Sequence, residues 1–322
     1  MLKHIPTHVI TGPLGAGKTS LIRHLLTQRP QHERWAVLVN EFGQIGLDAA
    51  LLHTTDAGIS LTELPGGCLC CVNGAPLQVA LVQLLRRAQP QRLFIEPSGL
   101  GHPATLLKQL AEGTWQGVLA IQPAVMVVDA HRLASGEQLP DAQREALPGV
   151  GLLVLNKSEL LNNRSRQALL ASLPDIQWQW TQQGRLPFNL LPGSACVAGQ
   201  RALDSLPVPP PGQRGPLPSL LLPGQPLRQI HEAEGRFAIG WRFHHSSQFN
   251  RQAVQTWLGA LPALLRAKAI LHADGQWWSF NQASGQGEWR ISEWRKDSRV
   301  ELIFETVVDA AALESDLMNY MQ

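Results

Sequence analysis

A glycine-rich segment near the start of the chain has the composition of a phosphate-binding loop. It reads GPLGAGKT over residues 12–19 and matches the pattern GxxxxGK[ST]. Its glycines allow backbone N–H groups to turn inward around an anion, and the helix that follows adds the positive end of its dipole. We expect Lys18 to reach the terminal phosphates and the Thr19 hydroxyl to coordinate Mg²⁺. The predicted nucleotide-binding residues of this segment are Gly12, Gly15, Ala16, Gly17, Lys18, Thr19 and Ser20.

A nucleotide hydrolase also needs acidic groups near its magnesium ion. The segment RLFIEPSGL ends an apolar stretch at Glu96, where P-loop hydrolases organise Mg²⁺ or its waters, and Gly99 lies where a backbone N–H senses a γ-phosphate. In VNEFGQIGLD, Asp48 and Glu41 are the candidate carboxylates of a first switch. Asp129, at the end of VMVVDA, is expected to be structural. The predicted catalytic residues are Lys18, Thr19, Asp48, Glu96 and Gly99, and the predicted magnesium ligands are Thr19, Asp48 and Glu96.

A third segment follows the apolar stretch GLLVLN and is similar to the NKxD signature that reads guanine. It is Asn156-Lys157-Ser158-Glu159. In that signature the last carboxylate accepts hydrogen bonds from the ring N–H and the amino group of guanine, a pair that adenine does not offer. Glu159 can accept the same two bonds, but it is one methylene longer than Asp, so the loop must shift. We therefore expect Asn156, Lys157 and Glu159 to contact the base, with guanine favoured and relaxed specificity left open.

Three of the four cysteines lie within four positions, in the segment GGCLCC. Cys68 and Cys70 face the same way in an extended chain, and the flanking glycines allow Cys71 to join them at a turn. Three thiolates suit Zn²⁺, Cu⁺ or, less tightly, Co²⁺. Because a closed structural zinc site needs four ligands, three favour metal delivery. The alternatives are a redox pair, which lacks the CxxC context, and a structural zinc knuckle, which lacks a local fourth ligand.

The order of these segments resembles one family. GPLGAGKTS, VNEFG, GGCLCC and IEPSGLGHP are similar to the CobW and CobW-like GTPases, which are relatives of the nickel-delivery GTPases HypB and UreG in the SIMIBI class. The likeness is greatest to the zinc-binding YeiR type, and it is stronger in the first half of the chain than in the second. It implies GTP hydrolysis to GDP with Mg²⁺, zinc held by Cys68, Cys70 and Cys71, and metal transfer to client proteins. It also implies that Glu96 and Gly99 belong to the second switch.

Three features depart from the family pattern. Pro13 takes the place of the usual Phe in GFLGAGKT, which stiffens the loop without removing a phosphate contact. Glu159 takes the place of Asp in the base motif. The frequent His-rich stretch of the family is missing, and His244-His245 is too short to replace it. This last departure removes support for extra metal storage but not for the thiolate site.

The elements that position these residues alternate along the first part of the chain. Short runs rich in Val, Ile and Leu are typical of strands covered on both faces, and helical patterns lie between them. This alternation predicts an α/β fold, the parallel sheet flanked by helices of P-loop NTPases. The expected strands cover residues 8–11, 35–40, 59–64, 92–96, 125–129 and 152–156, and the expected helices cover residues 18–26, 76–87, 104–112 and 164–173.

A stretch dense in Pro and Gly, residues 199–227, interrupts this alternation and is predicted to be a linker. The sequence therefore predicts a P-loop GTPase domain over residues 1–198 and a smaller α+β domain over residues 228–322. Six of the ten Trp residues lie in the second domain, and most of them are expected to pack in its core. Its expected strands are 236–244, 277–280, 289–294 and 300–306, and its expected helices are 251–265 and 310–321, the latter capped by Asp309.

The composition excludes some classes of partner. The formal net charge is +2, and the longest basic clusters are pairs such as Arg86-Arg87, which does not indicate a nucleic-acid partner. No apolar stretch approaches the ~18 residues of a membrane span, and the first segment runs directly into the phosphate loop, unlike a signal peptide. We therefore expect a soluble, cytoplasmic protein. Cys196 stands alone and is expected to be a small, partly buried hydrophobe.

Three functions are consistent with these motifs. In the first, GTP closes the switches and orders the cysteine loop between them, and hydrolysis releases the metal to a client metalloprotein. In the second, the chain is a sensor or scaffold that binds zinc and nucleotide with little turnover. The third, an ATP-using kinase-like enzyme, is disfavoured by the Asn156-Lys157 pair. P-loop relatives of this kind often pair across the nucleotide face, so a homodimer is an assembly to test.

Overall fold

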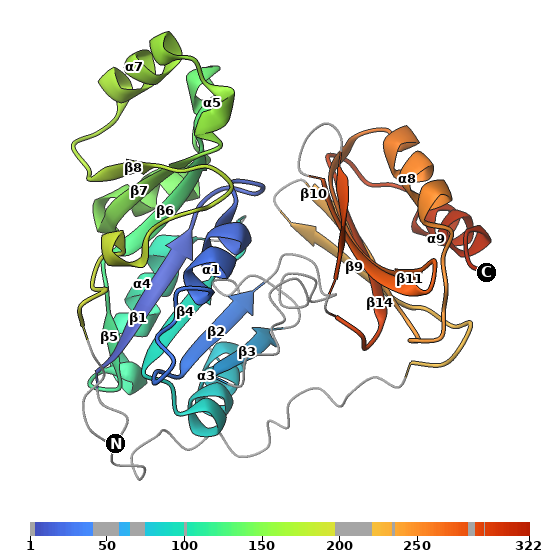
Figure 1. Ribbon diagram of the computed structural model, residues 1–322, viewed down its shortest axis with the longest axis horizontal. Coiled ribbons are helices and arrows are strands. Elements are labelled where there is room, and N and C mark those ends of the chain that lie inside the picture. The colour runs from blue at the N-terminus through green and yellow to red at the C-terminus, as the bar shows by residue number, and fades with distance from the viewer. Residues whose placement is uncertain are drawn as a thin grey trace. The chain divides into compact units, whose positions relative to one another are not determined.

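The computed structural model describes residues 4–40, 58–64, 75–99, 102–196, 221–233, 236–282, 287–292 and 294–322. The chain divides into two compact units. Among the described residues, the first unit contains a parallel sheet with helices packed on it, and the second contains an antiparallel sheet with two helices (Figure 1). The fold class predicted from the sequence is therefore confirmed.

The sheet of the first unit has the strand order β3-β2-β4-β1-β6-β7-β8, with β5 paired to the start of β1, and all of these pairs are parallel. In this order β1 lies between β4 and β6, so the carboxyl ends of β1, β4, β6 and β7 meet at one edge, where ligands bind in open α/β sheets. The strands are β1 (Ile5–Thr11), β2 (Trp35–Asn40), β3 (Ile59–Leu64), β4 (Arg92–Glu96), β5 (Leu119–Ile121), β6 (Ala124–Asp129), β7 (Val150–Asn156) and β8 (Trp178–Trp180).

Helices cover both faces of this sheet. α1 lies in front of it in Figure 1 and α4 lies behind it. Leucines of α3 and α4 form one core with alternate residues of β1, β2 and β4, such as Val9 and Leu38, which are fully buried. The helices are α1 (Lys18–Leu26), α3 (Ala75–Ala88), α4 (Pro103–Ala111), α5 (Ala130–Ala134), α6 (Asp141–Ala146) and α7 (Asn163–Ser172), with short 3-10 turns at η1 (Gly113–Trp115), η2 (Leu147–Gly149), η3 (Ser158–Leu160) and η4 (Phe188–Leu190).

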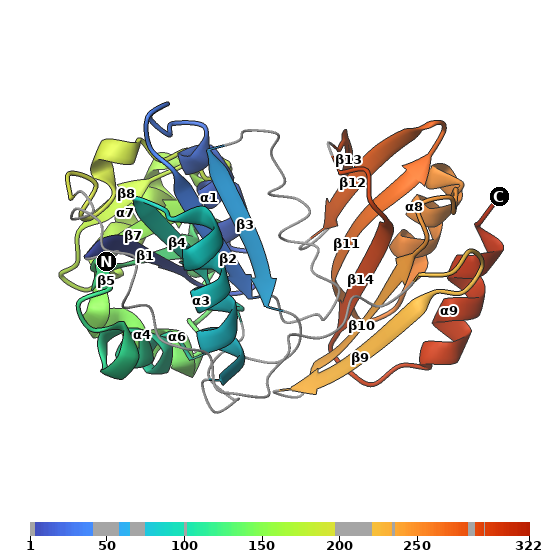
Figure 2. The same cartoon turned by 90° about the horizontal axis from the view of Figure 1, so that it is seen from below.

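The second unit is an antiparallel sheet of order β13-β12-β11-β14-β10-β9. Figure 2 shows α8 and α9 on the same face of this sheet. Their apolar residues pack on alternate residues of the central strands, including the fully buried Trp241. The elements are β9 (Leu227–Ala233), β10 (Arg236–Phe243), α8 (Arg251–Ala260), β11 (Leu264–Ala273), β12 (Gln276–Gln282), β13 (Glu288–Ile291), β14 (Ser298–Phe304) and α9 (Ala310–Asn319).

Local signals located several elements correctly. β2, β3, β4 and α1 have the predicted bounds, and the Asp309 carboxylate caps α9 by accepting from the N–H groups of Ala311 and Ala312. Four of the six Trp residues of the second unit are buried, as expected for core residues: Trp241, Trp257, Trp277 and Trp294. No helix among the described residues is long and apolar enough to cross a bilayer.

The helix expected over residues 251–265 is wrong in its last third, residues 261–265. α8 ends at Ala260, and β11 begins at Leu264. Pro262 restricts the residue before it to extended conformations, and Leu261 has ψ 122°, so the helix stops there. Ala263 then turns the chain with φ 55°. The prediction also omitted β5, β8, β9, β11, α5 and α6.

The predicted domain boundaries remain predictions. The boundary between residues 198 and 199 lies outside the described residues, and β9 begins at Leu227, inside the segment predicted to be a linker.

Cys196 corrects another expectation, because it is exposed rather than partly buried. Its carbonyl oxygen accepts a hydrogen bond of 2.8 Å from the Arg92 guanidinium, which holds the backbone inward and leaves the thiol outside.

Candidate functional site

The glycine-rich segment forms the turn between β1 and α1. Gly12, Gly15 and Gly17 all have positive φ, and the first and last of them are also closely packed. Gly12 has φ 136° and Gly17 has φ 106°, values that L side chains rarely adopt. A Cβ at Gly12 would also overlap the carbonyl oxygen of Val127, and one at Gly17 would overlap the Asn156 amide. The turn therefore brings the start of α1 close to the ends of β6 and β7.

Lys18 and Thr19 place two polar side chains at the start of α1. The Lys18 side chain is buried, and its Nζ donates to the carbonyl oxygens of Gly12 (3.0 Å) and Pro13 (3.1 Å). Thr19 Oγ1 donates to Glu96 Oε1 at 2.9 Å, although 77 residues separate the two. A hydroxyl and a buried carboxylate side by side are hard oxygen donors, the set that Mg²⁺ takes in phosphate sites. The residues present fit that ion.

Gly99 lies directly against the phosphate loop. A Cβ at this position would be 2.7 Å from the Leu14 nitrogen and 2.8 Å from Lys18 Nζ. The turn after β4 therefore contacts the loop after β1, and a side chain at residue 99 would have no space. The structure thus brings Gly99, a residue predicted for the second switch, close to Lys18, the predicted phosphate-binding lysine.

Asn156 connects three segments at the end of β7. Its Nδ2 donates to the Ala16 carbonyl at 2.8 Å, and its Oδ1 accepts from the Gly184 N–H at 2.9 Å and from Thr181 Oγ1 at 3.2 Å. The side chain is buried and uses both ends of its amide in these contacts. Asn156 therefore fixes the position of the phosphate loop relative to the loop that follows β8.

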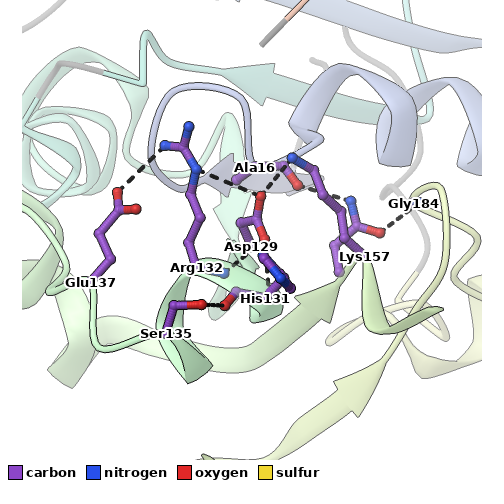
Figure 3. A network of polar contacts seen from close by, with 9 residues as sticks. Ala16, Asp129, His131, Arg132, Ser135, Glu137, Lys157 and Gly184 are labelled. Carbon is purple, nitrogen blue, oxygen red and sulfur yellow. Dashed lines mark hydrogen bonds and ion pairs between the residues drawn. The ribbon is translucent and has the colours of Figure 1, made fainter. Parts of the chain in front are cut away.

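Lys157 belongs to a chain of charged contacts beside this loop (Figure 3). Its backbone is left-handed, with φ 59°, and its Nζ contacts Asp129 Oδ2 at 2.6 Å. Asp129 also caps α5 through the N–H groups of His131 and Arg132. The Arg132 guanidinium lies 3.9 Å from Asp129 and 3.4 Å from Glu137. Asp129 is therefore structural, as predicted, and in addition it holds the lysine of the base motif.

The last part of the base motif forms η3. Ser158 is buried, its N–H donates to the Thr181 carbonyl at 3.1 Å, and its own carbonyl accepts from Arg166 at 2.7 Å. Glu159 is exposed. These contacts fix the backbone around Glu159 and leave its carboxylate open to a ligand, consistent with a base-reading role.

Three residues at this site were not predicted from the sequence. Thr181 and Gly184 lie in the loop after β8 and support Asn156. The sequence does contain a signal for these two residues, because the segment TQQG, residues 181–184, follows β8 and contains a turn glycine. Gln143 of α6 contacts both Thr11 and Gly99, and nothing in its sequence context distinguishes it from a surface residue.

Ser20 lies in the first turn of α1, and five other predicted residues lie outside the described residues. They are Glu41 and Asp48 of the first switch and the metal-binding candidates Cys68, Cys70 and Cys71. Their roles stay predictions. Those predicted residues that the structure describes, from the phosphate loop, the turn after β4 and the end of β7, come together at the carboxyl edge of the sheet.

Comparison with known proteins gives consistent results for both units. Residues 6–179 match the family model described as CobW/HypB/UreG, nucleotide-binding domain, and residues 238–321 match the Cobalamin synthesis protein cobW C-terminal domain. The chain is 34% identical to the zinc chaperone YeiR of Escherichia coli, covering 97% of each chain. It is 30% identical to the zinc chaperone CobW of Pseudomonas aeruginosa, covering 60% of each. A solved structure of Zn(II)-bound YjiA GTPase from E. coli aligns over 100% of both chains, with TM-score 0.44 and 15% identity.

Proposed function

The chain belongs to the CobW/HypB/UreG family, and from this premise we propose that it is a GTPase that couples hydrolysis of GTP to GDP and phosphate with delivery of zinc to client metalloproteins. The observation that carries the nucleotide part is the meeting of Thr19, Glu96 and Gly99 at the phosphate loop. A phosphate-binding loop alone would support binding only. The carboxylate and the close-packed glycine add the groups that a γ-phosphate and its metal ion require.

The described residues suit the two ends of a nucleotide. The glycine turn and the start of α1 would hold the phosphates, with Lys18 neutralising their charge. Thr19 and Glu96, with the predicted Asp48, would hold Mg²⁺, which when bound neutralises charge on the phosphate oxygens. Lys157 and the exposed Glu159 would contact the base, so we propose guanine as the preferred base.

The zinc part of the proposal rests on the cysteine segment and on the relatives. Two of the similar proteins are named zinc chaperones, and a third, from Dictyostelium discoideum and 26% identical, is named a zinc-regulated GTPase metalloprotein activator. We propose that Cys68, Cys70 and Cys71 bind the transported zinc. Their segment lies in the sequence between the phosphate loop and the second switch, so nucleotide state can change its order. By linkage, zinc and GTP must then change each other's affinity by the same factor.

The deciding experiment measures the affinity of the protein for zinc by chelator competition, with Mg²⁺ present. It compares the protein bound to a non-hydrolysable GTP analogue with the protein bound to GDP. We expect the analogue to tighten zinc binding by tenfold or more, about 1.4 kcal/mol of coupling. The triple substitution C68S/C70S/C71S should abolish tight zinc binding in both nucleotides. C196S is the matched control. It also removes a thiol, but Cys196 is exposed and lies outside the cysteine cluster.

The outcomes separate the competing functions. Equal zinc affinity in the two nucleotides would contradict nucleotide-driven delivery. Zinc binding that survives the triple substitution would contradict the site. If coupling is present but single-turnover hydrolysis of GTP is negligible, the chain is a zinc- and nucleotide-dependent sensor or scaffold. We further propose that the protein acts in the cytoplasm on a client metalloprotein. Measuring the molecular mass of the protein in solution, with GDP and with the GTP analogue, tests whether it forms a homodimer.

A further inference from the structure

One buried amide joins the strand before the phosphate loop to the turn that carries Gly99. Gln143 lies on α6, and its side chain has no exposed surface. Its Oε1 accepts from Thr11 Oγ1 at 3.1 Å, and its Nε2 donates to the Gly99 carbonyl at 3.5 Å. Thr11 is the last residue of β1, immediately before Gly12. The amide therefore spans two segments of the nucleotide site that are distant in the sequence.

The two hydrogen bonds determine the orientation of the amide. A backbone carbonyl only accepts, so the Gln143 nitrogen must face Gly99. The amide oxygen then faces Thr11, whose hydroxyl donates to it. Gln is the residue that supplies a donor and an acceptor at opposite sides of one planar group at this reach. Leu or Met of similar length would fill the same space but leave both polar groups unpaired.

Gly99 needs such a restraint because glycine has the greatest backbone freedom of any residue. A larger residue would be more restricted, but the contacts of Gly99 with Leu14 and Lys18 leave no room for a Cβ. Holding its carbonyl fixes the plane of the peptide that follows Gly99 and so restricts ψ, the torsion angle that relates this plane to the Gly99 N–H. Ordering a binding group in advance lowers the entropy lost when its ligand binds.

We propose that Gln143 is a positioning residue that holds the Gly99 peptide ready for a γ-phosphate and so favours GTP over GDP. This inference rests on the proposed function, since it assumes that Gly99 contacts the γ-phosphate. GDP lacks that group, so the restraint should change GDP affinity little. The competing explanation is that Gln143 only docks α6 on the sheet, which would affect stability but not the preference between the nucleotides.

The test compares the dissociation constants of GDP and of a non-hydrolysable GTP analogue, with Mg²⁺ present, in Q143M and Q143E. Q143M keeps the volume but removes both the donor to Gly99 and the acceptor for Thr11. We expect it to weaken analogue binding by about fivefold, the value of one ordinary hydrogen bond to the Gly99 carbonyl, with GDP affinity within twofold. Q143E keeps an acceptor for Thr11 but places a second acceptor against the Gly99 carbonyl oxygen. We therefore expect it to lose more affinity for the analogue than Q143M does. Single-turnover GTP hydrolysis should slow in the same order.

Gln28 supplies the matched control. It is a partly buried amide that also joins two segments, donating to the Leu186 carbonyl at 2.9 Å and accepting from the Phe188 N–H at 2.8 Å. Q28M should leave the ratio of the two dissociation constants unchanged. T11V tests the other end of the link: it removes the hydroxyl that orients the amide and should shift the ratio in the same direction by a smaller factor.

The outcomes are distinguishable. An unchanged ratio in folded Q143M and Q143E, or an equal shift in Q28M, would overturn the positioning role and leave the proposed function intact. If Q143M does not fold, T11V decides, and an unchanged ratio there would overturn the role in the same way. Failure of the unmodified chain to bind either guanine nucleotide would overturn the proposed function and this inference with it.

Discussion

At the residue scale, the contact between Asp129 and Lys157 has two separable parts. The Asp129 carboxylate caps α5 through one oxygen and contacts Lys157 Nζ at 2.6 Å through the other. Asn is as good a helix cap as Asp but carries no charge. D129N should therefore keep the helix start and weaken the hold on the lysine. We expect the dissociation constant for GDP to rise about three- to tenfold, measured by fluorescence titration, with a small change in melting temperature.

Glu137 provides the comparison for this substitution, because it lies at the outer, exposed end of the same charged chain. E137Q removes a charge from the network without touching Asp129 or Lys157, so GDP affinity should not change. Equal effects in D129N and E137Q would show that net charge, rather than the position of the lysine, controls binding.

Gly17 tests the need for close approach in the phosphate loop. G17A would place a Cβ against the Asn156 amide and require an unfavourable φ of 106°. Gly136 has a comparable φ of 89°, but a Cβ there meets nothing within 4 Å. Both substitutions should cost about 1 kcal/mol of backbone strain, while G17A alone should lower nucleotide affinity at least tenfold. Isothermal titration with GDP measures the difference, and similar affinities for the two variants would contradict the predicted clash.

At the element scale, β1 and β4 are joined by a buried contact between His8, in the middle of β1, and Arg92, the first residue of β4. Arg92 Nη1 donates to His8 Nε2 at 2.7 Å, and neither side chain is appreciably exposed. Burial first, and the Arg92 charge second, lower the pKa of His8 to about 3. His8 is therefore neutral in the folded protein at neutral pH and serves as the acceptor for Arg92.

This shift predicts how stability depends on pH. In the unfolded chain His8 takes up a proton near pH 6.5, whereas in the folded protein it does so only near pH 3, so acid favours the unfolded state between these values. At pH 5 this difference in proton binding lowers the free energy of unfolding by about 2 kcal/mol. H8Q keeps an acceptor for Arg92 but does not titrate. Its free energy of unfolding should therefore fall less than that of the unmodified chain between pH 7 and pH 5.

Chemical denaturation at a series of pH values measures this difference. The exposed His245 supplies the control, and H245Q should follow the unmodified chain. If H8Q and the unmodified chain lose the same stability between pH 7 and pH 5, His8 is protonated in the folded state and the explanation is wrong.

At the scale of the whole molecule, each of the two units has its own hydrophobic core. The second unit also contains a buried charged cluster, in which Asp297 accepts from Arg299 at 2.7 Å, from Arg242 at 2.6 Å and from the Trp294 indole at 2.9 Å. Burial alone would raise the pKa of the Asp297 carboxyl, but Arg299 and Arg242 hold that pKa below its usual range. This carboxylate therefore supports the second unit in its ionised form.

D297N should destabilise the second unit by about 3 kcal/mol, because it removes the charge of a buried carboxylate that pairs with two guanidinium groups. GDP affinity should stay within twofold, since the described nucleotide residues, from the phosphate loop to the end of β7, belong to the first unit. D274N removes the exposed ion pair between Arg251 and Asp274 and should change stability by less than about 1 kcal/mol. Thermal unfolding with and without GDP measures both effects. A large loss of GDP affinity in D297N would show that the second unit contributes to the nucleotide site.

The sequence by itself determined those features that depend on neighbouring residues. The bounds of β2, β3, β4 and α1 follow from short apolar runs, the glycine turn follows from a contiguous motif, and the α9 cap follows from one Asp. These signals are local because strand and helix propensities, turns and caps act within a few residues. The cysteine cluster is also read from a contiguous segment, and its role as a metal site stays a prediction.

The tertiary structure decided which of these local features meet. Glu96 contacts Thr19 across 77 residues, Gln143 contacts Thr11 across 132, and Asn156 contacts Ala16 across 140. These pairs exist because β1 lies between β4 and β6 in the sheet, an order set by the burial of all strands and helices together. Gln143 shows the consequence: on a helix of ordinary composition it has no sequence signal, and only the strand order gives it two partners at the nucleotide site.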